Sequence, residues 1–175
     1  DGIGSGYNNF WDGMYFSEVD MTINNGLGDV LNDNKNTFVV SQTSEKITAI
    51  QHQNGEDVWV VVRLENWDTE MSNTYHSYLL TSNGLIDSPV ISNVGPYYFH
   101  TLGYLKASHD GSKVAAANFR TTGVYVEDVI SDFNLFDFDN GTGILSNPMT
   151  FDFPWPGGYG NAPYGLEFSP DGNLL

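Results

Sequence analysis

The side chains of this sequence that could do chemistry are mainly carboxylates, and the best-organised set lies in the stretch "DFDNGTG". Asp137, Asp139 and Asn140 place alternating oxygen ligands before a glycine, an arrangement found in calcium-binding loops. The further acids and the bidentate Glu of an EF-hand are missing, however. We therefore expect a carboxylate here to accept hydrogen bonds from the backbone N–H groups of its own turn, with a bound calcium ion as the alternative.

Other catalytic patterns are missing from the sequence. The four histidines form no His-x-His pair and no pair at i, i+4, so they carry no zinc signature: His52, His76, His100 and His109. Ser5 in "GIGSG" lacks the spacing of a nucleophile elbow. A pair of glycosidase-type carboxylates remains an alternative, because the sequence does not give distances between residues that folding brings together. We predict no catalytic residue and no cofactor.

Aromatic side chains in loops are the stronger candidates for binding. They lie between expected strands, in stretches rich in Pro, Gly and Asn, and the ligand-binding set that we predict is Trp67, Tyr97, Tyr98, His100, Trp155 and Tyr159. A ring offers contact area, while neighbouring amides and carboxylates supply hydrogen bonds, so the set suits recognition of a protein or a glycan. The alternative is that these rings pack against neighbouring elements of the fold.

The charge balance narrows the choice of partner. Six Lys and Arg stand against 22 Asp and Glu, a formal net charge of −16, which repels phosphate backbones. Nucleic acid is therefore not an expected partner. The chain has no cysteine, which excludes disulfides, thiolate metal sites and a cysteine nucleophile. No apolar run in this segment approaches the length of a membrane span.

The elements that must position these residues recur along the chain. Asn54-Gly55, Asp110-Gly111 and Asp171-Gly172 follow one another at spacings of 56 and 61 residues, each after a short apolar strand. Asn-Gly and Asp-Gly between such runs are strong hairpin signals, because Gly adopts positive φ without steric cost. A second series of strand, turn and strand contains Gly26, Gly84 and Gly143, spaced by 58 and 59 residues.

Four short strands in about 60 residues, with no helical periodicity, predict the blade of an all-β propeller. A β-sandwich is the alternative, although it gives no reason for a fixed repeat of turn chemistry. The length of 175 residues holds about three four-stranded blades, whereas closed propellers have roughly 4 to 8. We therefore expect residues 1–175 to be part of a single propeller domain, truncated at both ends. Its approximate blade pieces are 1–46, 47–103, 104–163 and 164–175.

Five segments carry a family resemblance: "YFSEVDMTINNGLGDV", "EKITAIQHQNGEDVWVV", "GYLKASHDGSKVAAANF", "NLFDFDNGTGILSNP" and "YGLEFSPDGNLL". They resemble consecutive parts of the WD-like propeller region in large exported surface proteins of Bacteroidota, which often end in a gliding-motility-associated or type IX secretion sorting domain. The resemblance covers about residues 14–175 in the family's order. His109 stands where the pattern usually has Pro, and "VISDFNLFDFD" is unusually acidic. The resemblance implies a secreted or cell-surface location and a role in adhesion or architecture, and it supplies no catalytic mechanism.

Two classes of function follow. The expected one is a non-enzymatic surface module, which recognises a protein or glycan or serves as a spacer among the other domains of a long exported chain. The alternative is a propeller enzyme of the lactonase or glycan-cleaving type. Carboxylate, His or Asn side chains that converge at the inner-strand ends of several blades would favour the enzyme.

Overall fold

The computed structural model describes residues 13–65, 72–98, 102–121, 129–152 and 163–175. These residues form β-strands and two short 3-10 turns, with no α-helix among them, so the all-β prediction is confirmed. The chain divides into two compact units, 1–43 and 44–175. Each unit is described by itself.

The first unit contains two short antiparallel pairs. β1 (Gly13–Phe16) pairs with β4 (Thr37–Ser41), and β2 (Val19–Asp20) pairs with β3 (Asp29–Val30). Two 3-10 turns, Asn24–Gly26 and Asn32–Asn34, follow β2 and β3 respectively. None of the side chains described in 13–43 is buried, so this unit has no apolar core of its own among those residues.

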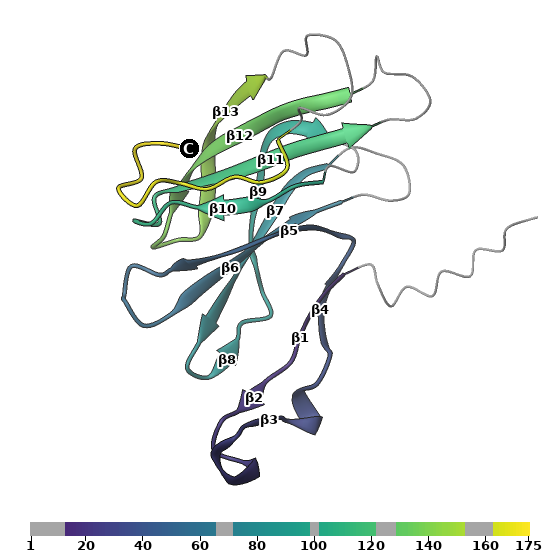
Figure 1. The fold of residues 1–175 in the computed structure, drawn as a ribbon, viewed down its shortest axis with the longest axis vertical. Coiled ribbons are helices and arrows are strands. Elements are labelled where there is room, and N and C mark those ends of the chain that lie inside the picture. Colours follow the sequence, from purple (N-terminus) through teal and green to yellow (C-terminus); the bar gives the residue numbers. More distant parts are fainter. Residues whose placement is uncertain (1–12, 66–71, 99–101, 122–128, 153–162) are drawn as a thin grey trace, which may run out of the picture. The chain divides into compact units, whose positions relative to one another are not determined.

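The second unit begins with an antiparallel sheet, the first sheet, whose strands are mostly consecutive neighbours (Figure 1). Its strands are β5 (Thr43–Gln51), β6 (Val58–Leu64), β7 (Ser72–Thr81), β8 (Gly84–Leu85) and β9 (Val90–Tyr98). β5, β6 and β7 are paired in sequence order, and both β8 and β9 pair with β7. β6 reads "VWVVVRL", and its β-branched residues suit a strand that is covered on both faces.

The second sheet repeats this plan. β10 (Leu105–Ala107), β11 (Lys113–Thr121), β12 (Val129–Asp139) and β13 (Ile144–Asp152) pair antiparallel in sequence order. An extended segment, 163–169, then lies beside β10, because the Tyr104 N–H donates to the Tyr164 carbonyl at 2.8 Å and Lys106 forms a 2.8 Å ion pair with Glu167. This segment has no assigned strand.

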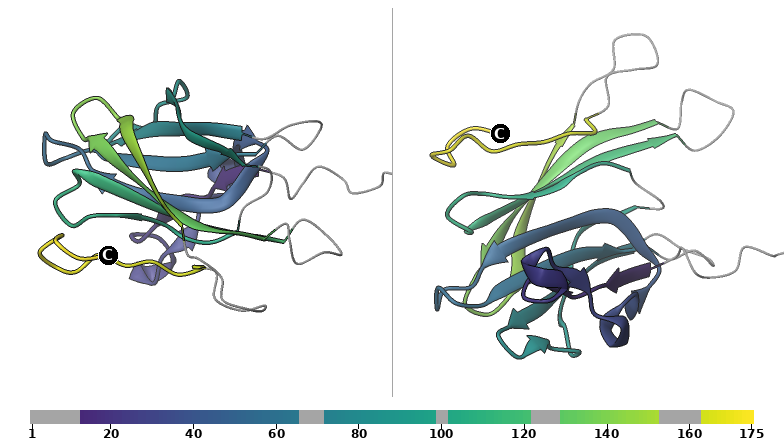
Figure 2. Two further views of the ribbon diagram at one scale, coloured as in Figure 1. Left: turned by 90° about the horizontal axis from the view of Figure 1, so that it is seen from above. Right: turned by 60° about the horizontal axis from the view of Figure 1, so that its bottom comes forward.

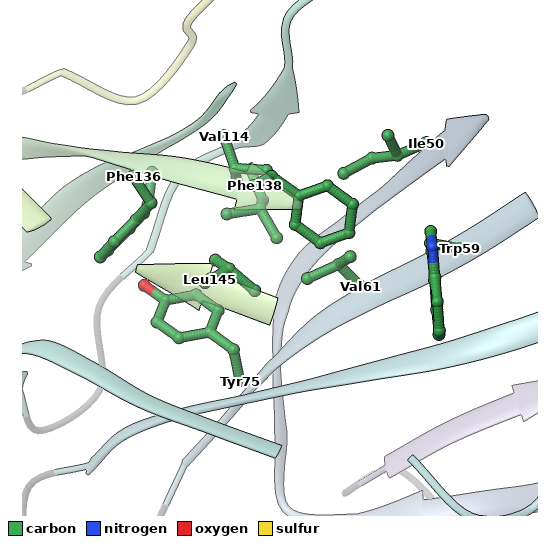
Figure 3. Close-up of a cluster of buried hydrophobic side chains, with 10 residues drawn as sticks. Ile50, Trp59, Val61, Tyr75, Val114, Phe136, Phe138 and Leu145 are labelled. Atoms are coloured by element: carbon green, nitrogen blue, oxygen red, sulfur yellow. The ribbon is translucent and has the colours of Figure 1, made fainter. Parts of the chain in front are cut away.

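The core lies between the two sheets, which form separate layers in Figure 2. Figure 3 shows side chains from both sheets pointing toward one another, and the core residues are Ile50, Trp59, Val61, Tyr75, Leu105, Val114, Ala116, Phe136, Phe138 and Leu145. The first strands of the two sheets lie near each other, and so do their last strands. Gly103, just before β10, donates its N–H to Glu45 of β5 at 2.7 Å, and Leu145 of β13 donates its N–H to Ser92 of β9 at 3.0 Å.

The three hairpin turns predicted from Asn-Gly and Asp-Gly have the same backbone hydrogen bonds. In each, residue i donates its N–H to the carbonyl of i+5 and the glycine at i+3 donates to the carbonyl of i, where residue i is His52, Ser108 or Ser169. The glycines have φ of +76°, +70° and +71°. Gly26, Gly84 and Gly143 also have positive φ. The predicted repeat of turn chemistry is therefore confirmed.

The two sheets occupy consecutive stretches of the chain. The strands of the first sheet lie between residues 43 and 98, and those of the second lie between residues 105 and 152. No sheet formed by the described residues closes on itself. The structure thus shows repeated, stacked antiparallel sheets.

Candidate functional site

Two of the six predicted ligand-binding residues fall within the described chain. Trp67, His100, Trp155 and Tyr159 lie outside the described residues. Tyr97 and Tyr98 are neighbours in β9, and side chains alternate between the two faces of a strand. Tyr97 is 63% exposed, whereas Tyr98 is only 6% exposed. Tyr97 can therefore meet a ligand at the surface, while Tyr98 contributes to the interior.

Tyr98 belongs to a group of buried polar side chains between the two sheets, the inter-sheet polar cluster. Its members are Lys46, Arg63, Glu65, Tyr98, Asn118, Asp132 and Asn134. The Tyr98 hydroxyl donates to Asp132 at 2.8 Å, and the Asn118 amide donates to Asp132 at 2.8 Å and to Asn134 at 2.9 Å. These bonds join β9 of the first sheet to β11 and β12 of the second.

Arg63 connects this cluster to the end of the first sheet. Its guanidinium donates to Glu65, to the Ser72 carbonyl at 2.8 Å and to the Tyr98 carbonyl at 3.2 Å, and it lies 5.9 Å from the centre of the Tyr98 ring. Asn118 is fully buried, and its side-chain oxygen has no hydrogen-bond partner among the described residues. The cluster is therefore a largely satisfied polar layer rather than an open binding surface.

Burial changes the protonation of the cluster. It lowers the pKa of Lys46 to about 7, assisted by the positive charge of Arg63. Burial also raises the pKa of Asp132, against the opposing effect of the hydrogen bonds from Asn118 and Tyr98. Both shifts favour the neutral form of a side chain in a low-dielectric layer.

The acidic stretch considered for calcium forms a hairpin between β12 and β13. Asp139 accepts hydrogen bonds from the N–H groups of Gly141 at 2.9 Å and Thr142 at 3.3 Å, which confirms the expected turn bonding. Asp137 instead forms an ion pair with Lys113 and accepts a 2.7 Å hydrogen bond from Asn147.

The backbone carbonyl of Asn140, the third calcium candidate, accepts the Trp59 indole N–H at 2.9 Å. This bond ties the β12–β13 hairpin to the first sheet. Within the described ranges, no three His, Asp or Glu side chains gather as a metal site. The bonds made by all three candidates favour a structural turn.

An open groove of about 620 Å³ lies along the first strands of the repeats. We call it the inner groove. Its walls are residues 48–53 and Gly55 on one side, 106–111 on the other, and Asn140 and Glu167. β5, β10 and the segment 163–169 all contribute, together with two of the repeated turns. The described lining residues offer mostly amide, hydroxyl, imidazole and charged groups, and imidazole is the only aromatic ring among them.

Titratable groups of the inner groove form hydrogen bonds or an ion pair. Asp110 accepts hydrogen bonds from the Ser108 hydroxyl and from the Ser112 N–H and hydroxyl, which lower its pKa to about 2. Lys106 pairs with Glu167, whose side chain is 70% exposed, and this contact lowers the pKa of Glu167. His52 accepts the Asn54 N–H at its Nδ1 atom. Each carboxylate of the groove therefore already has a partner.

Sequence reasoning missed the polar cluster and the groove. Asp132, Asn134, Phe136 and Phe138 alternate along β12 and all are buried, so the period-two pattern marked polar residues on an inward face. Arg63 likewise continues the inward series of Trp59 and Val61. No local signal identified the groove, because its walls come from strands that are distant in sequence.

Comparison with known proteins found no matching family model, no matching curated protein and no matching solved structure. In the part of the chain that is described, no helix has the length and apolar character needed to span a membrane.

Proposed function

We propose that the chain is part of a β-propeller that acts as a non-enzymatic recognition module, or as a spacer, in a large exported surface protein. The location at the cell surface follows from the family resemblance of the five repeated segments. The other domains of such a protein, and a surface protein or glycan, are the proposed partners.

One observation carries the propeller proposal: two consecutive sheets stack with first strand near first strand and last strand near last strand. The segment 163–169 then occupies the corresponding place beside β10. Blades of a propeller are four-stranded sheets repeated around an axis, which requires this order of packing. The two sheets of a sandwich need not share it, and closed rings of roughly 4 to 8 blades require further blades beside the described sheets.

Recognition is favoured over catalysis by the state of the groove carboxylates. Asp110 is held by its turn, and Glu167 is held by Lys106. Neither is placed as an unpaired acid or base beside a second carboxylate, so the groove offers hydrogen-bonding groups rather than a catalytic pair.

The enzyme alternative has one observation in its favour. His52, His109, Asp110, Asn140 and Glu167 all lie at the inner groove, which is where a propeller enzyme would assemble its reacting groups. If catalysis occurs there, hydrolysis of a lactone or polysaccharide should be detected with the chain and abolished by Glu167→Gln.

A glycan array tests recognition directly. We expect the folded chain to bind without product release, and the double variant Trp67→Ala/Tyr97→Ala to bind more weakly with an unchanged circular dichroism spectrum. Lost structure in that variant would assign the two rings to the fold. Measurable turnover that depends on Glu167 would replace this proposal with the enzyme.

A further inference from the structure

The inner groove runs along an edge of β5 that pairs with no other described strand. Among the described residues, β5 pairs only with β6 and β10 pairs only with β11. The groove is lined by residues 48–51 of β5, by 106–107 of β10 and by the turns that follow these two strands. Along a strand edge that pairs with no other strand, backbone donors and acceptors are exposed.

The hairpin turn after β5 indicates which backbone N–H and C=O groups of this strand point toward β6 and which point away from it. His52 donates its N–H to the carbonyl of Asp57, across the β5–β6 hairpin. In an antiparallel ladder, alternate residues direct their backbone groups to the partner strand and the others direct them away. Ile50 therefore directs its backbone groups toward β6, whereas Ala49 directs its own toward the open edge. Ala49 is also exposed, so a ligand can reach it.

The chain itself provides an example of an extended segment held beside a first strand. The segment 163–169 lies beside β10, held by the bond from the Tyr104 N–H to the Tyr164 carbonyl and by the ion pair of Lys106 with Glu167. The rings of Tyr104 and Tyr164 also contact, with centroids 5.6 Å apart. A backbone bond combined with side-chain pairing is how a peptide adds to a sheet edge.

The charge of the groove indicates the sign of the ligand. Its lining carries one lysine, Lys106, against two carboxylates, Asp110 and Glu167. Glu167 is largely exposed despite its ion pair. The whole chain has a formal net charge of −16, which attracts cationic ligands to any open site.

We propose that the inner groove binds an extended peptide bearing Lys or Arg side chains, by strand addition to the free edge of β5. This proposal rests on the recognition function proposed above and names the class of its ligand. Among the described lining residues no Phe, Tyr or Trp ring offers a stacking surface, which favours a peptide over a glycan at this place.

Fluorescence anisotropy with a labelled decapeptide of alternating Thr and Lys tests the proposal, with alternating Thr and Glu as the matched control. We expect saturable binding of the Thr-Lys peptide and none of the Thr-Glu peptide. Ala49→Pro removes the N–H that faces the groove and is compatible with an edge strand, so binding should weaken about two- to tenfold. Ala49→Val keeps the N–H and should bind like wild type. Glu167→Gln should also weaken binding of the Thr-Lys peptide.

A Thr-Lys peptide with N-methyl groups on alternate residues provides a second measurement, which leaves the protein unchanged and covers the case in which Ala49→Pro does not fold. We expect it to lose binding because its backbone donors are blocked. Equal binding of the methylated and unmethylated peptides, or equal affinity of the two folded Ala49 variants, would overturn strand addition. Glycan binding without peptide binding would overturn this inference alone, and absence of both would also remove the recognition function.

Discussion

Lys46 is a buried residue whose protonation differs between the folded and the unfolded chain. Its pKa of about 7 in the folded chain lies below its ordinary value of 10.5, because burial disfavours the ammonium and Arg63 adds a like charge. Between these two values the unfolded chain binds the proton and the folded chain does not. The free energy of unfolding should therefore rise with pH from about 7 to about 10.5.

Replacing Lys46 by Met should remove this rise in stability. The side chains have similar length, and Met carries no titratable group, so this position no longer couples folding to the binding of a proton. Urea unfolding at pH 7, 8, 9 and 10 measures the slope. Lys106→Met, at the partly exposed Lys106, is the control and should keep the wild-type slope. An unchanged slope in Lys46→Met would contradict the assignment.

Replacing Tyr98 or Tyr97 by Phe removes one hydroxyl group, from the buried face or from the exposed face of β9. Tyr98→Phe removes the hydroxyl that donates to buried Asp132, so we expect a loss of about 1–3 kcal/mol. Tyr97→Phe changes an exposed ring and should cost less than about 0.5 kcal/mol. Chemical denaturation of both variants gives the comparison. Equal effects would show that the buried bond contributes nothing measurable.

At the scale of elements, the repeated turns give a matched pair of glycines. Gly55 and Gly111 have nearly equal positive φ, but an added Cβ at Gly55 meets nothing within 4 Å, while at Gly111 it would lie 3.0 Å from Ile50 Cγ2. Gly55→Ala should lose about 1 kcal/mol from backbone strain alone. Gly111→Ala should lose more, because Ile50 must also move in the core. Thermal unfolding of the two variants checks this order, and a larger loss in Gly55→Ala would contradict it.

The turn carboxylates should titrate alike, because their hydrogen bonds repeat. Asp110 and Asp171 each accept bonds from a serine two residues earlier and from the residue two positions later, and each has a pKa lowered to about 2. Their stabilising bonds are present above the ordinary value of 3.8 and are lost as pH falls through about 2. Carboxyl carbon shifts in NMR between pH 1 and 6 follow both groups. A titration midpoint near 4 at either site would show that its turn does not form.

For the whole molecule, the division into two units has a measurable consequence. The described side chains of the first unit are not buried, whereas the second unit holds a core between its sheets. Removing residues 1–42 should therefore shift the melting temperature by less than about 4 °C, the effect of roughly 1 kcal/mol in a chain of this size. Calorimetry of the full and shortened chains measures the shift. A larger fall would show that the first unit contributes to the stability of the second.

The sequence by itself determined the strands, the turns and their repetition. Gly55, Gly111 and Gly172 mark turns because positive φ is a property of the residue, and Asp110 holds its turn through bonds to residues two positions away. Such signals are local, so they can be recognised without the fold. They also predicted Asp139 as a turn carboxylate, which bonds within three residues.

Only the tertiary structure decided which polar groups are buried and where a ligand can enter. The bond from Tyr98 to Asp132 spans 34 residues, and the bond from Gly103 to Glu45 spans 58. The neutral state favoured for Lys46 arises from burial between strands of different sheets. The inner groove depends in the same way on β5 and β10 lying together. Burial and charge interactions depend on distance in space, and the order of residues along a chain does not contain that distance until the sheets have packed.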